Sequence, residues 1–383
     1  MNDCDKLSQQ HLSVMRLAVI LPSLAGGGLE RVQINLVKEW VRQGIEIDLV
    51  VSRLHGPLSN LIPAGSSVFE LAGSQPYLFP IGLFRYLKAR KPTHILSSAN
   101  DLNAITLFIA GLLMLRVPIV ISVHNHLSSE LQLAKGGELV KLRIVVWLLK
   151  HMIHRSGAVI AVSQGVADDL AHHLPLKPGQ LHVVYNPVIS PETYRQIAIP
   201  LLNCPVPQGT PWILYVGRLT QAKGVDLLIN AFQKISQSAN AHLVLMGSGP
   251  LQDDIEKQIA RIGLTPRIHL VGFQVNPLPW MQKADVVVLP SRHEGLGNVL
   301  IEAMACGTQV VATDCPSGPS EILDGGQFGQ LVPVDDCEEL SKALLNSLTG
   351  EFKVDSDLLI KRAQLYTESR AAKEYLTLLR GSK

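Results

Sequence analysis

The sequence predicts an α/β protein made of two doubly wound domains that face each other across a central cleft. Short apolar runs alternate with segments whose apolar residues recur at helical spacing, which is typical of parallel sheets with crossover helices. The alternation stops in a proline-rich stretch and then starts again. The chain also has 383 residues, 47% of them hydrophobic, which is too long for one ordinary core and suits two domains of roughly 180 residues each.

The first half opens with the apolar run RLAVILPSL, followed by the glycine loop AGGG at residues 25–28 and by LERVQINLVKEWVRQG, which has helical spacing. We therefore expect a strand, a loop and a helix. Helical patterns lie between most of the later apolar runs, so a largely parallel sheet is expected. Those later runs predict strands at residues 45–53, 93–98, 117–123 and 158–163.

A proline-rich stretch, YNPVISPETYRQIAIPLLNCPVPQGTP, lies between the two halves. Its X-Pro pairs disfavour helix, so we place the linker near residues 187–210. The expected domains are residues 1–190 and 205–383. We also expect the last helix of the second domain to pack back on the first.

The second half repeats the pattern of the first. Helix-like segments separate its apolar runs, so a second doubly wound domain is expected, and two such sheets facing each other would leave a cleft. The runs predict strands at residues 210–219, 241–247, 267–273, 284–290 and 308–313.

Several classes of protein are disfavoured by the sequence. The five cysteines show no Cys-x-x-Cys spacing, which argues against a disulfide framework and a zinc site. No segment reaches the roughly 20 apolar residues of a membrane-spanning helix, and the nearest, at residues 104–115, stops at Arg116. The start of the chain has neither the basic nor the apolar region of a secretory signal, so we expect a cytoplasmic protein.

Charge is shared unevenly between the halves. Residues 1–190 contain 17 Lys and Arg against 12 Asp and Glu, a balance of +5, and residues 191–383 contain 17 against 20, a balance of −3. The first half could therefore favour an anionic partner. Aromatic residues are only 5% of the chain and no basic run interleaves with them, so we expect no binding of nucleic acid.

The run RHEGLGNVLIEAMACG holds two glutamates, Glu294 and Glu302, around a glycine-rich patch. Asn298 is the expected N-cap of a helix, which places Glu302 one turn inside it. Gly295 and Gly297 would let a ligand approach the main chain, and the amides at the helix start would attract an anion. A phosphate or a sugar could bind there, with the glutamates accepting hydrogen bonds from hydroxyls such as those of a ribose. The alternative is a capped surface helix with two solvated acids.

The segment GRLTQAKG follows directly on the predicted strand ILYV. Arg218 and Lys223 would therefore project at the carboxyl end of a parallel strand, where such sheets bind ligands. Two cations suit a diphosphate, and together they could neutralise charge that develops on a leaving phosphate. The alternative is a β-turn with solvated charges.

Three further signals are weaker. The glycine turn GSGP at residues 247–250 could let the backbone approach a nucleotide, but it does not complete a Gly-x-Gly-x-x-Gly motif, and neither does GGGLER; a dinucleotide site is thus poorly supported. The AGGG loop could wrap a phosphate or an acceptor, or it could form only a tight turn. His124 follows the strand VPIVISV, near the expected cleft, and the alternative is a polar loop histidine.

Taken together, the glycine loop, the strand-end histidine, GRL-x4-G, GSGP and Glu-x7-Glu resemble the retaining glycosyltransferases of family 4, which have the GT-B fold. The resemblance covers nearly the whole chain, including AVSQGVADDL and YNPV. It implies that Glu294 contacts the donor sugar and Glu302 the ribose. It also implies that Arg218 and Lys223 hold the diphosphate and that His124 touches the transferred sugar. Other donor contacts are then expected from Gly27, Gly217, Gly249, Gly295, Leu296, Gly297, Asn298 and Val299.

The resemblance also implies a reaction. A nucleotide-sugar donor would bind the second domain and an acceptor the first, with transfer through an oxocarbenium-like transition state and retention of configuration. The leaving diphosphate would help to deprotonate the acceptor. No metal or cofactor is expected, and the Asp-x-Asp motif at residues 3–5 lies in a polar tail ahead of the first strand.

Two local features refine this reading. Leu296 stands where many members of the family carry an aromatic residue, which could change the packing around the sugar. The run TDCPSGPSEIL is similar to members that build bacterial surface glycans, lipopolysaccharide or lipid-linked oligosaccharides from UDP-sugars. A UDP-hexose or UDP-N-acetylhexosamine is therefore the expected donor, and a glycan or lipid-linked glycan the expected acceptor.

The segment ELVKLRIVVWLLKHMIHR predicts a helix on which Arg143, Lys150 and His154 share one face. Such a stripe could lie against anionic lipid headgroups, so peripheral membrane contact is a hypothesis. The alternative is a core helix with one solvated edge.

Three other functions compete with glycosyl transfer as explanations of these motifs. A GT-B nucleotide-sugar epimerase is the main alternative, because it also cleaves a bond to UDP. A glycan phosphorylase would need a lysine bound to pyridoxal phosphate. A catalytically inactive binding protein would not need both glutamates together with Arg218 and Lys223.

Overall fold

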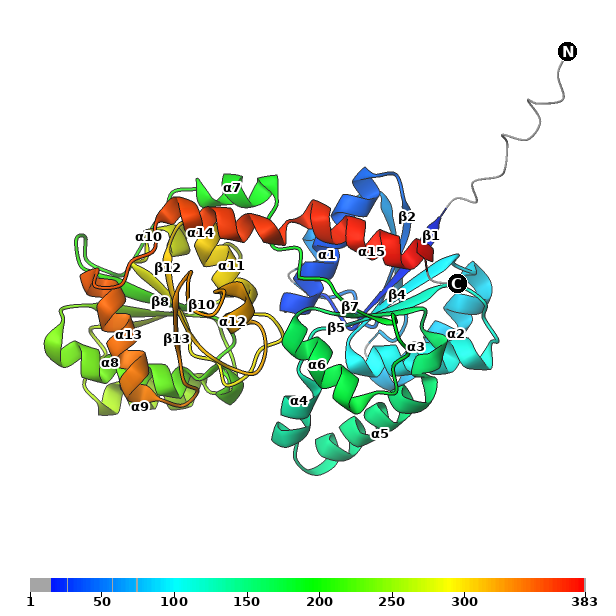
Figure 1. The fold of residues 1–383 in the computed structure, drawn as a ribbon, viewed down its shortest axis with the longest axis horizontal. Coiled ribbons are helices and arrows are strands. Elements are labelled where there is room, and N and C mark those ends of the chain that lie inside the picture. Colours follow the sequence, from blue (N-terminus) through cyan, green and yellow to red (C-terminus); the bar gives the residue numbers. More distant parts are fainter. Residues whose placement is uncertain (1–14, 26, 57, 74, 382–383) are drawn as a thin grey trace, which may run out of the picture.

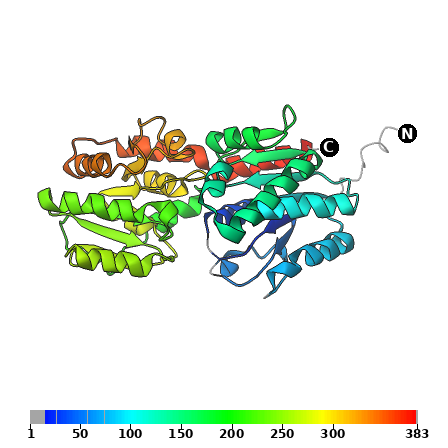
Figure 2. The same ribbon diagram turned by 90° about the horizontal axis from the view of Figure 1, so that it is seen from below.

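The computed structural model describes residues 15–25, 27–56, 58–73 and 75–381 (Figure 1). These residues form two parallel sheets, each with helices on both faces, and the two lobes lie side by side (Figures 1 and 2). The predicted pair of doubly wound α/β domains is therefore confirmed.

The N-terminal sheet has the strand order β3-β2-β1-β4-β5-β6-β7 within the described residues, and all its pairs are parallel. Its strands are β1 (Arg16–Leu21), β2 (Glu46–Val51), β3 (Ser66–Glu70), β4 (His94–Ser98), β5 (Ile119–Val123), β6 (Ala158–Ala161) and β7 (Leu181–Val183). Its helices are α1 (Gly28–Arg42), α2 (Phe79–Arg90), α3 (Asn100–Leu112), α4 (Leu127–Leu133), α5 (Gly136–Met152) and α6 (Gln164–His173).

The C-terminal sheet has the order β10-β9-β8-β11-β12-β13, again with parallel pairs. Its strands are β8 (Trp212–Val216), β9 (His242–Met246), β10 (Ile268–Gly272), β11 (Val286–Leu289), β12 (Gln309–Thr313) and β13 (Gln330–Val332). The helices of this half are α7 (Pro191–Ile197), α8 (Val225–Ser238), α9 (Gln252–Arg261), α10 (Leu278–Lys283), α11 (Asn298–Ala305), α12 (Pro319–Ile322), α13 (Cys337–Thr349), α14 (Ser356–Ala363) and α15 (Glu368–Gly381).

Every apolar run that predicted a strand forms one, and three strands were not predicted. These three, β3, β7 and β13, all lie at sheet edges. An edge strand is buried less than a central one, so its sequence carries a weaker apolar signal. The strand β3 reads SSVFE with no fully buried residue, and β7 and β13 have three residues each.

The chain passes between the lobes twice, and the two passages are bonded to each other. Residues 184–190 lead from β7 to α7, and residues 364–367 lead from α14 back to α15. The amides of Val188 and Ile189 both donate to the carbonyl of Tyr366, at 3.0 and 2.9 Å. Figure 1 shows α15, in red, lying over α1 of the N-terminal lobe. The last helix therefore shares a core with the first domain.

That shared core is centred on Trp40 of α1. Its ring lies 6.2 Å from that of Tyr375, and its Nε1 donates to the carbonyl of Ala372 at 3.1 Å. Among the described helices, none is long and apolar enough to cross a membrane. The apolar run at residues 104–115 falls on α3, and most of its side chains on that helix are buried.

We expect Trp40→Ala to lower the free energy of unfolding by about 3–5 kcal/mol, because it leaves a large cavity and an unpaired carbonyl between α1 and α15. Urea unfolding of the full chain measures this change. Trp147→Ala is the matched control, because Trp147 is 58% exposed whereas Trp40 is fully buried. Equal stability losses in the two variants would contradict the assignment of Trp40 to a core that joins the halves.

Candidate functional site

The candidate site lies where the strand order of the C-terminal sheet reverses. From β8 the chain builds outward to β9 and β10, and it then returns to place β11 on the other side of β8. Loops that leave the carboxyl ends of such neighbouring strands diverge, and this opening is where doubly wound sheets bind ligands. The loop after β8 carries Arg218 and Lys223, and the loop after β11 carries Glu294. The fold therefore brings the two predicted motifs together.

Lys223 and Glu294 form an ion pair across this opening. The Nζ atom of Lys223 lies 2.5 Å from Oε1 of Glu294, and the hydroxyl of Ser291 donates to the same oxygen at 2.7 Å. The side chain of Glu294 is only 9% exposed. A carboxylate so far removed from water needs charged or hydrogen-bonding partners, and here it has both.

The loops are held together by close backbone contacts. Gly224 has φ of 64°, and a Cβ there would lie 1.9 Å from the carbonyl oxygen of Pro290. Gly249 packs against the backbone of Leu219, and Gly217 lies beside the hydroxyl of Tyr215. Gly224 and the predicted Gly249 therefore let the loops after β8, β9 and β11 come into contact, whereas Gly217 only makes room for the Tyr215 hydroxyl.

Arg218 is the free cation of the site. Its side chain is exposed, and it has no carboxylate partner within 4.0 Å in the part of the chain that the structure describes. Burial raises the pKa of the nearby Tyr215, and Glu294 raises it further whereas Arg218 lowers it. Arg218 and Glu294 thus both lie close enough to Tyr215 to shift its pKa. Arg218, which has no carboxylate partner among the described residues, remains available to bind an anion.

The helix α11 begins at Asn298, and its N-cap is Gly297, with φ of 96°. The prediction that Asn298 is the N-cap is therefore wrong by one residue. A left-handed turn is needed to lead the loop into the helix, and glycine adopts it without strain. The side-chain oxygen of Asn298 instead accepts a hydrogen bond from Asn186 of the first domain, at 2.8 Å. Leu296 is buried, and Val299 is partly buried at the start of α11.

Glu302 lies in the second turn of α11, largely buried, and burial raises the pKa of its carboxyl. Its charged neighbour is Arg31 of α1, whose Nη1 lies 3.9 Å away. Arg31 also donates to the carbonyl of Val275, at 3.3 Å. A residue of the first domain therefore reaches the position that the family resemblance assigns to the ribose.

The first domain touches the site through His124 and Ser163. A Cβ on Gly295 would lie 1.8 Å from the carbonyl oxygen of His124, so the two backbones are in direct contact. The hydroxyl of Ser163 donates to the carbonyl of Gly295, at 2.6 Å. The ring of His124 turns inward, with Nε2 at 3.2 Å from the hydroxyl of Ser122. His124 thus presents its carbonyl, rather than its imidazole, to the loop that holds Glu294.

The glycine loop of the first domain is only partly described. Gly26 lies outside the described residues, as does the Asp-x-Asp motif at residues 3–5. Gly27 is the N-cap of α1, and Gly28 lies near the amide group of Asn298. The loop therefore faces the start of α11 across the domain boundary.

Glu321 of α12 was not predicted as a site residue, yet it joins the domains. Its carboxylate accepts hydrogen bonds from the amides of Gln164 and Gly165, at 2.7 and 2.9 Å, and from the hydroxyl of Tyr185, at 3.2 Å. Glu321 and Arg31 both belong to runs noted in the sequence, TDCPSGPSEIL and GGGLER. Local sequence patterns do not indicate which residue of the other domain a side chain will contact, so the roles of Glu321 and Arg31 could not be predicted.

Potential metal ligands do not gather in the described part of the chain, where no group of three or more His, Cys, Asp or Glu is placed to hold an ion. The chain has a second Asp-x-Asp motif at residues 355–357, which was not considered among the predicted sites. It caps α14, because the side chain of Asp355 accepts from the amides of Asp357 and Leu358.

Two family models match the chain. The model described as Glycosyltransferase Family 4 matches residues 26–189, and the model described as Glycosyl transferases group 1 matches residues 210–349. Over 241 residues the chain is 30% identical to the N-acetylgalactosamine-N,N'-diacetylbacillosaminyl-diphospho-undecaprenol 4-alpha-N-acetylgalactosaminyltransferase of Campylobacter jejuni. That match covers 61% of this chain and 63% of the relative, so it spans less than two thirds of the relative's length.

Solved structures show the same architecture. The apo form of the lipopolysaccharide outer core galactosyltransferase WaaB matches with a TM-score of 0.71 at 18% identity, over 96% of this chain and 100% of the other. HepE of Anabaena in complex with UDP-glucose matches with a TM-score of 0.74 at 21% identity, over 96% and 99%. These likenesses confirm the predicted GT-B fold.

We expect His124 to make the protein sensitive to acid. Burial lowers the pKa of His124 to about 4, whereas an unfolded histidine titrates near pH 6.5. Between these values the unfolded chain binds a proton that the folded chain does not, so stability falls as the pH falls, by roughly 2–3 kcal/mol at about pH 4.5.

Denaturant unfolding of wild type and His124→Asn at about pH 7 and 4.5 isolates this effect. Glu368, whose pKa burial raises to about 7, acts in the opposite sense in both proteins, so it cancels in the comparison. The wild type should lose more stability on acidification than the variant. Equal losses would show that the His124 ring is not buried in its neutral form.

Proposed function

This chain belongs to the glycosyltransferases of family 4, and we propose on that basis that it transfers a sugar from a nucleotide-sugar donor to a glycan or lipid-linked glycan acceptor. The proposed donor is a UDP-hexose or a UDP-N-acetylhexosamine, and the proposed context is the biosynthesis of a bacterial surface polysaccharide such as lipopolysaccharide. The relative from Campylobacter supports a lipid-linked acceptor, since its name includes a diphospho-undecaprenol. The complex of HepE with UDP-glucose supports a UDP-linked donor.

The observation that carries this proposal is the ion pair of Lys223 with Glu294 at the strand-order reversal, beside the free Arg218. Two cations within reach of a helix start suit a diphosphate, and a carboxylate beside them suits the hydroxyls of the attached sugar. Glu302 then lies one turn further along α11, at a position suited to a ribose.

In the proposed reaction, the bond between the anomeric carbon and the oxygen of the leaving phosphate breaks. The acceptor hydroxyl forms its bond on the same face of the sugar, and its proton passes to the leaving diphosphate. Lys223 and Arg218 neutralise the charge that builds on that diphosphate, which is the largest charge change in the reaction. We propose that these two cations serve in place of a metal, and that transfer persists in EDTA.

Donor binding requires the domains to part. The contact between Gly295 and the carbonyl of His124 has no room for a hexose. Motion at the two passages between the lobes would open this contact. Once it opens, His124 would meet the transferred sugar through its carbonyl, or through its imidazole after rotation away from Ser122. A cytoplasmic location and the absence of nucleic-acid binding remain part of this proposal.

Lys223→Ala and Arg218→Ala should each lower kcat/KM for transfer by about 100-fold or more, because charge on the leaving group then goes uncompensated. Lys223→Arg should retain part of the activity, since it keeps the cation beside Glu294. Product formation is followed with a radiolabelled donor. Lys257→Ala, an exposed lysine of α9, is the matched control and should behave as wild type.

Thermal unfolding separates these effects from misfolding. A thermal-shift screen over UDP-, GDP- and ADP-sugars identifies the donor, because a ligand of the native state raises the melting temperature. Near-normal turnover of both Lys223→Ala and Arg218→Ala would overturn the assignment of the diphosphate site. An isomerised sugar formed from UDP-sugar alone would instead identify an epimerase.

A further inference from the structure

The N-terminal domain exposes a strip of large apolar side chains on two neighbouring helices. The helices α3 and α5 pack side by side, and α5 runs along the lower side of this lobe in Figure 1 and toward the viewer in Figure 2. Scattered exposed apolar residues are ordinary, but a contiguous set marks an interaction surface. We call this set the apolar strip; it consists of Phe108, Leu112 and Met114 on or just after α3 and of Val140, Ile144 and Trp147 on α5.

The strip is a consequence of helical spacing on α5. Val140, Ile144 and Trp147 follow one another at intervals of four and three, so they lie on one face of the helix. Val145, Val146 and Leu149 supply the opposite face, and these are the buried residues of α5. Trp147 is 58% exposed and Met114 is 80% exposed. The helix is therefore apolar on both sides, and among the described residues only one side is covered by the rest of the chain.

Cations border the strip on both sides. At about 100° per residue, Arg143 and Lys150 flank the line of Ile144 and Trp147 on one side, and Lys141 flanks it on the other. All three are exposed, but Lys141 pairs with Asp101 at the start of α3, at 3.4 Å, whereas Arg143 and Lys150 have no carboxylate within 4.0 Å among the described residues. The acidic residue of this helix, Glu138, falls on a different face by the same geometry. Of the predicted stripe of Arg143, Lys150 and His154, the first two lie on α5 along one edge of the apolar surface. His154 does not continue the stripe on the same helix, because α5 ends at Met152 and His154 lies in the 3₁₀ turn that follows.

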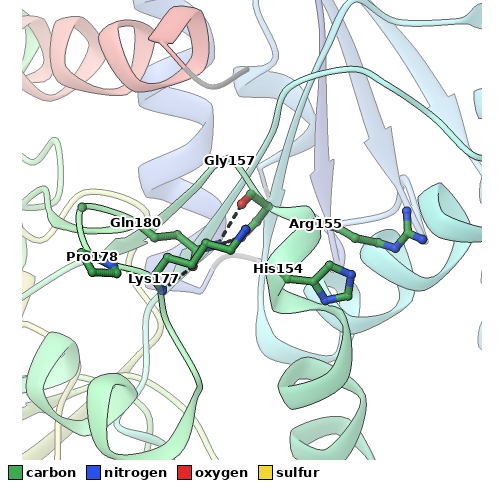
Figure 3. Close-up of a pocket in the computed structure, with 8 residues that line it drawn as sticks. His154, Arg155, Gly157, Lys177, Pro178 and Gln180 are labelled. Atoms are coloured by element: carbon green, nitrogen blue, oxygen red, sulfur yellow. Dashed lines mark hydrogen bonds between the residues drawn. The ribbon is translucent and has the colours of Figure 1, made fainter.

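More cations lie where α5 ends, at the amino edge of the sheet. There a hollow of about 220 Å³ is lined by the cations Arg155 and Lys177 and by His154, together with residues 156–157 and 178–180 (Figure 3). Figure 3 shows Arg155 extending away from Lys177. A second hollow of about 270 Å³ lies beside the first and is lined by Arg116 and Arg155. Neither hollow has an acidic residue in its lining.

The turn that carries these cations is firmly held. The side-chain amide of the buried Gln180 donates to the carbonyls of Ile153 and Ser156, at 2.9 and 2.8 Å. Arg155 itself lies against Gly111 of α3. The cations are therefore presented from a fixed turn at the end of the apolar strip.

We propose that the apolar strip and its cationic border dock the protein on an anionic lipid bilayer. The side chains of the strip enter the interfacial zone, and the lysines and arginines contact headgroup phosphates. A second copy of the chain fits less well, because pairing two strips would bring their cationic borders together. The proposal stands independently of the transfer reaction, since it concerns a face formed by α3 and α5 rather than the cleft.

The tryptophans provide a specific readout. Of the four in the chain, Trp40, Trp212 and Trp280 are 0%, 5% and 7% exposed, so Trp147 is the only exposed one. Binding to phosphatidylglycerol vesicles should shift its emission to the blue, and brominated lipid acyl chains should quench it. Trp147→Phe should abolish the quenching while it preserves flotation with the vesicles.

Flotation of the full chain with vesicles tests the two parts of the surface. Ile144→Ser combined with Trp147→Ser should weaken binding by about tenfold or more. Arg143→Gln combined with Lys150→Gln should weaken it by roughly fivefold per cation at low salt. Leu358→Ser on α14 and Lys257→Gln on α9 are the matched controls, because they remove an exposed apolar residue and an exposed cation elsewhere. Both controls should bind as wild type.

Several results would overturn the proposal. These are the absence of wild-type flotation with phosphatidylglycerol vesicles at low salt, equal flotation with purely phosphatidylcholine vesicles, and quenching that survives in Trp147→Phe. A wild-type dimer in solution that Trp147→Ser converts to a monomer would assign the strip to self-association instead. Circular dichroism and melting temperature confirm that each variant is folded, so loss of binding cannot be mistaken for loss of structure.

Discussion

The ion pair between Lys223 and Glu294 is the interaction on which the site depends. A carboxylate that is 9% exposed would cost several kcal/mol if it were left unpaired, so the loops after β8 and β11 must meet where the pair can form. Their meeting fixes the residues that follow: Gly295 against the first domain, Gly297 at the turn and the start of α11. A diphosphate that binds here must share Lys223 with Glu294. The pair therefore fixes the loops of the proposed diphosphate site without a ligand.

Polar contacts join the domains beside the apolar cluster that holds Val162 and Leu296. Gly295 touches the carbonyl of His124, Ser163 donates to Gly295, and the carboxylate of Glu321 receives two amides at the start of α6. Hydrogen bonds of this kind can be exchanged for water at a net cost of about 1 kcal/mol each, unlike a large apolar interface. The core around Trp40 and Tyr375, by contrast, ties α15 to the first domain. The lobe separation proposed for donor binding would break these polar contacts and leave the connection at the chain passages intact.

The fold could be predicted from the sequence because strand and helix periods are local properties of buried segments, and the central strands are all buried. The edge strands β3, β7 and β13 were not predicted, because few of their side chains are buried and their sequences are therefore less apolar. In the site, Arg218 and Lys223 were predicted to follow one parallel strand, but the ion pair of Lys223 with Glu294 was not predicted, because it depends on how the loops after β8 and β11 pack. The N-cap of α11 was predicted at Asn298 but is Gly297, because the left-handed turn before the helix favours glycine over a side-chain cap. The inward ring of His124 and the contacts of Arg31 and Glu321 were out of reach, because they depend on partners far away in the sequence.

The structure shows where some of the excess positive charge of the first half lies. The cations proposed to bind the donor, Arg218 and Lys223, belong to the acidic second half, and the first half adds Arg31 beside Glu302. Other cations of the first half, Arg143 and Lys150 on α5 and Arg155 at its end, lie near exposed apolar side chains. Solubility alone would favour polar residues in place of Ile144 and Trp147, since their exposure is unfavourable in water. An anionic lipid surface would interact with both kinds of group on this face. Its apolar interior would bury the apolar side chains, and its negative headgroups would bind the cations.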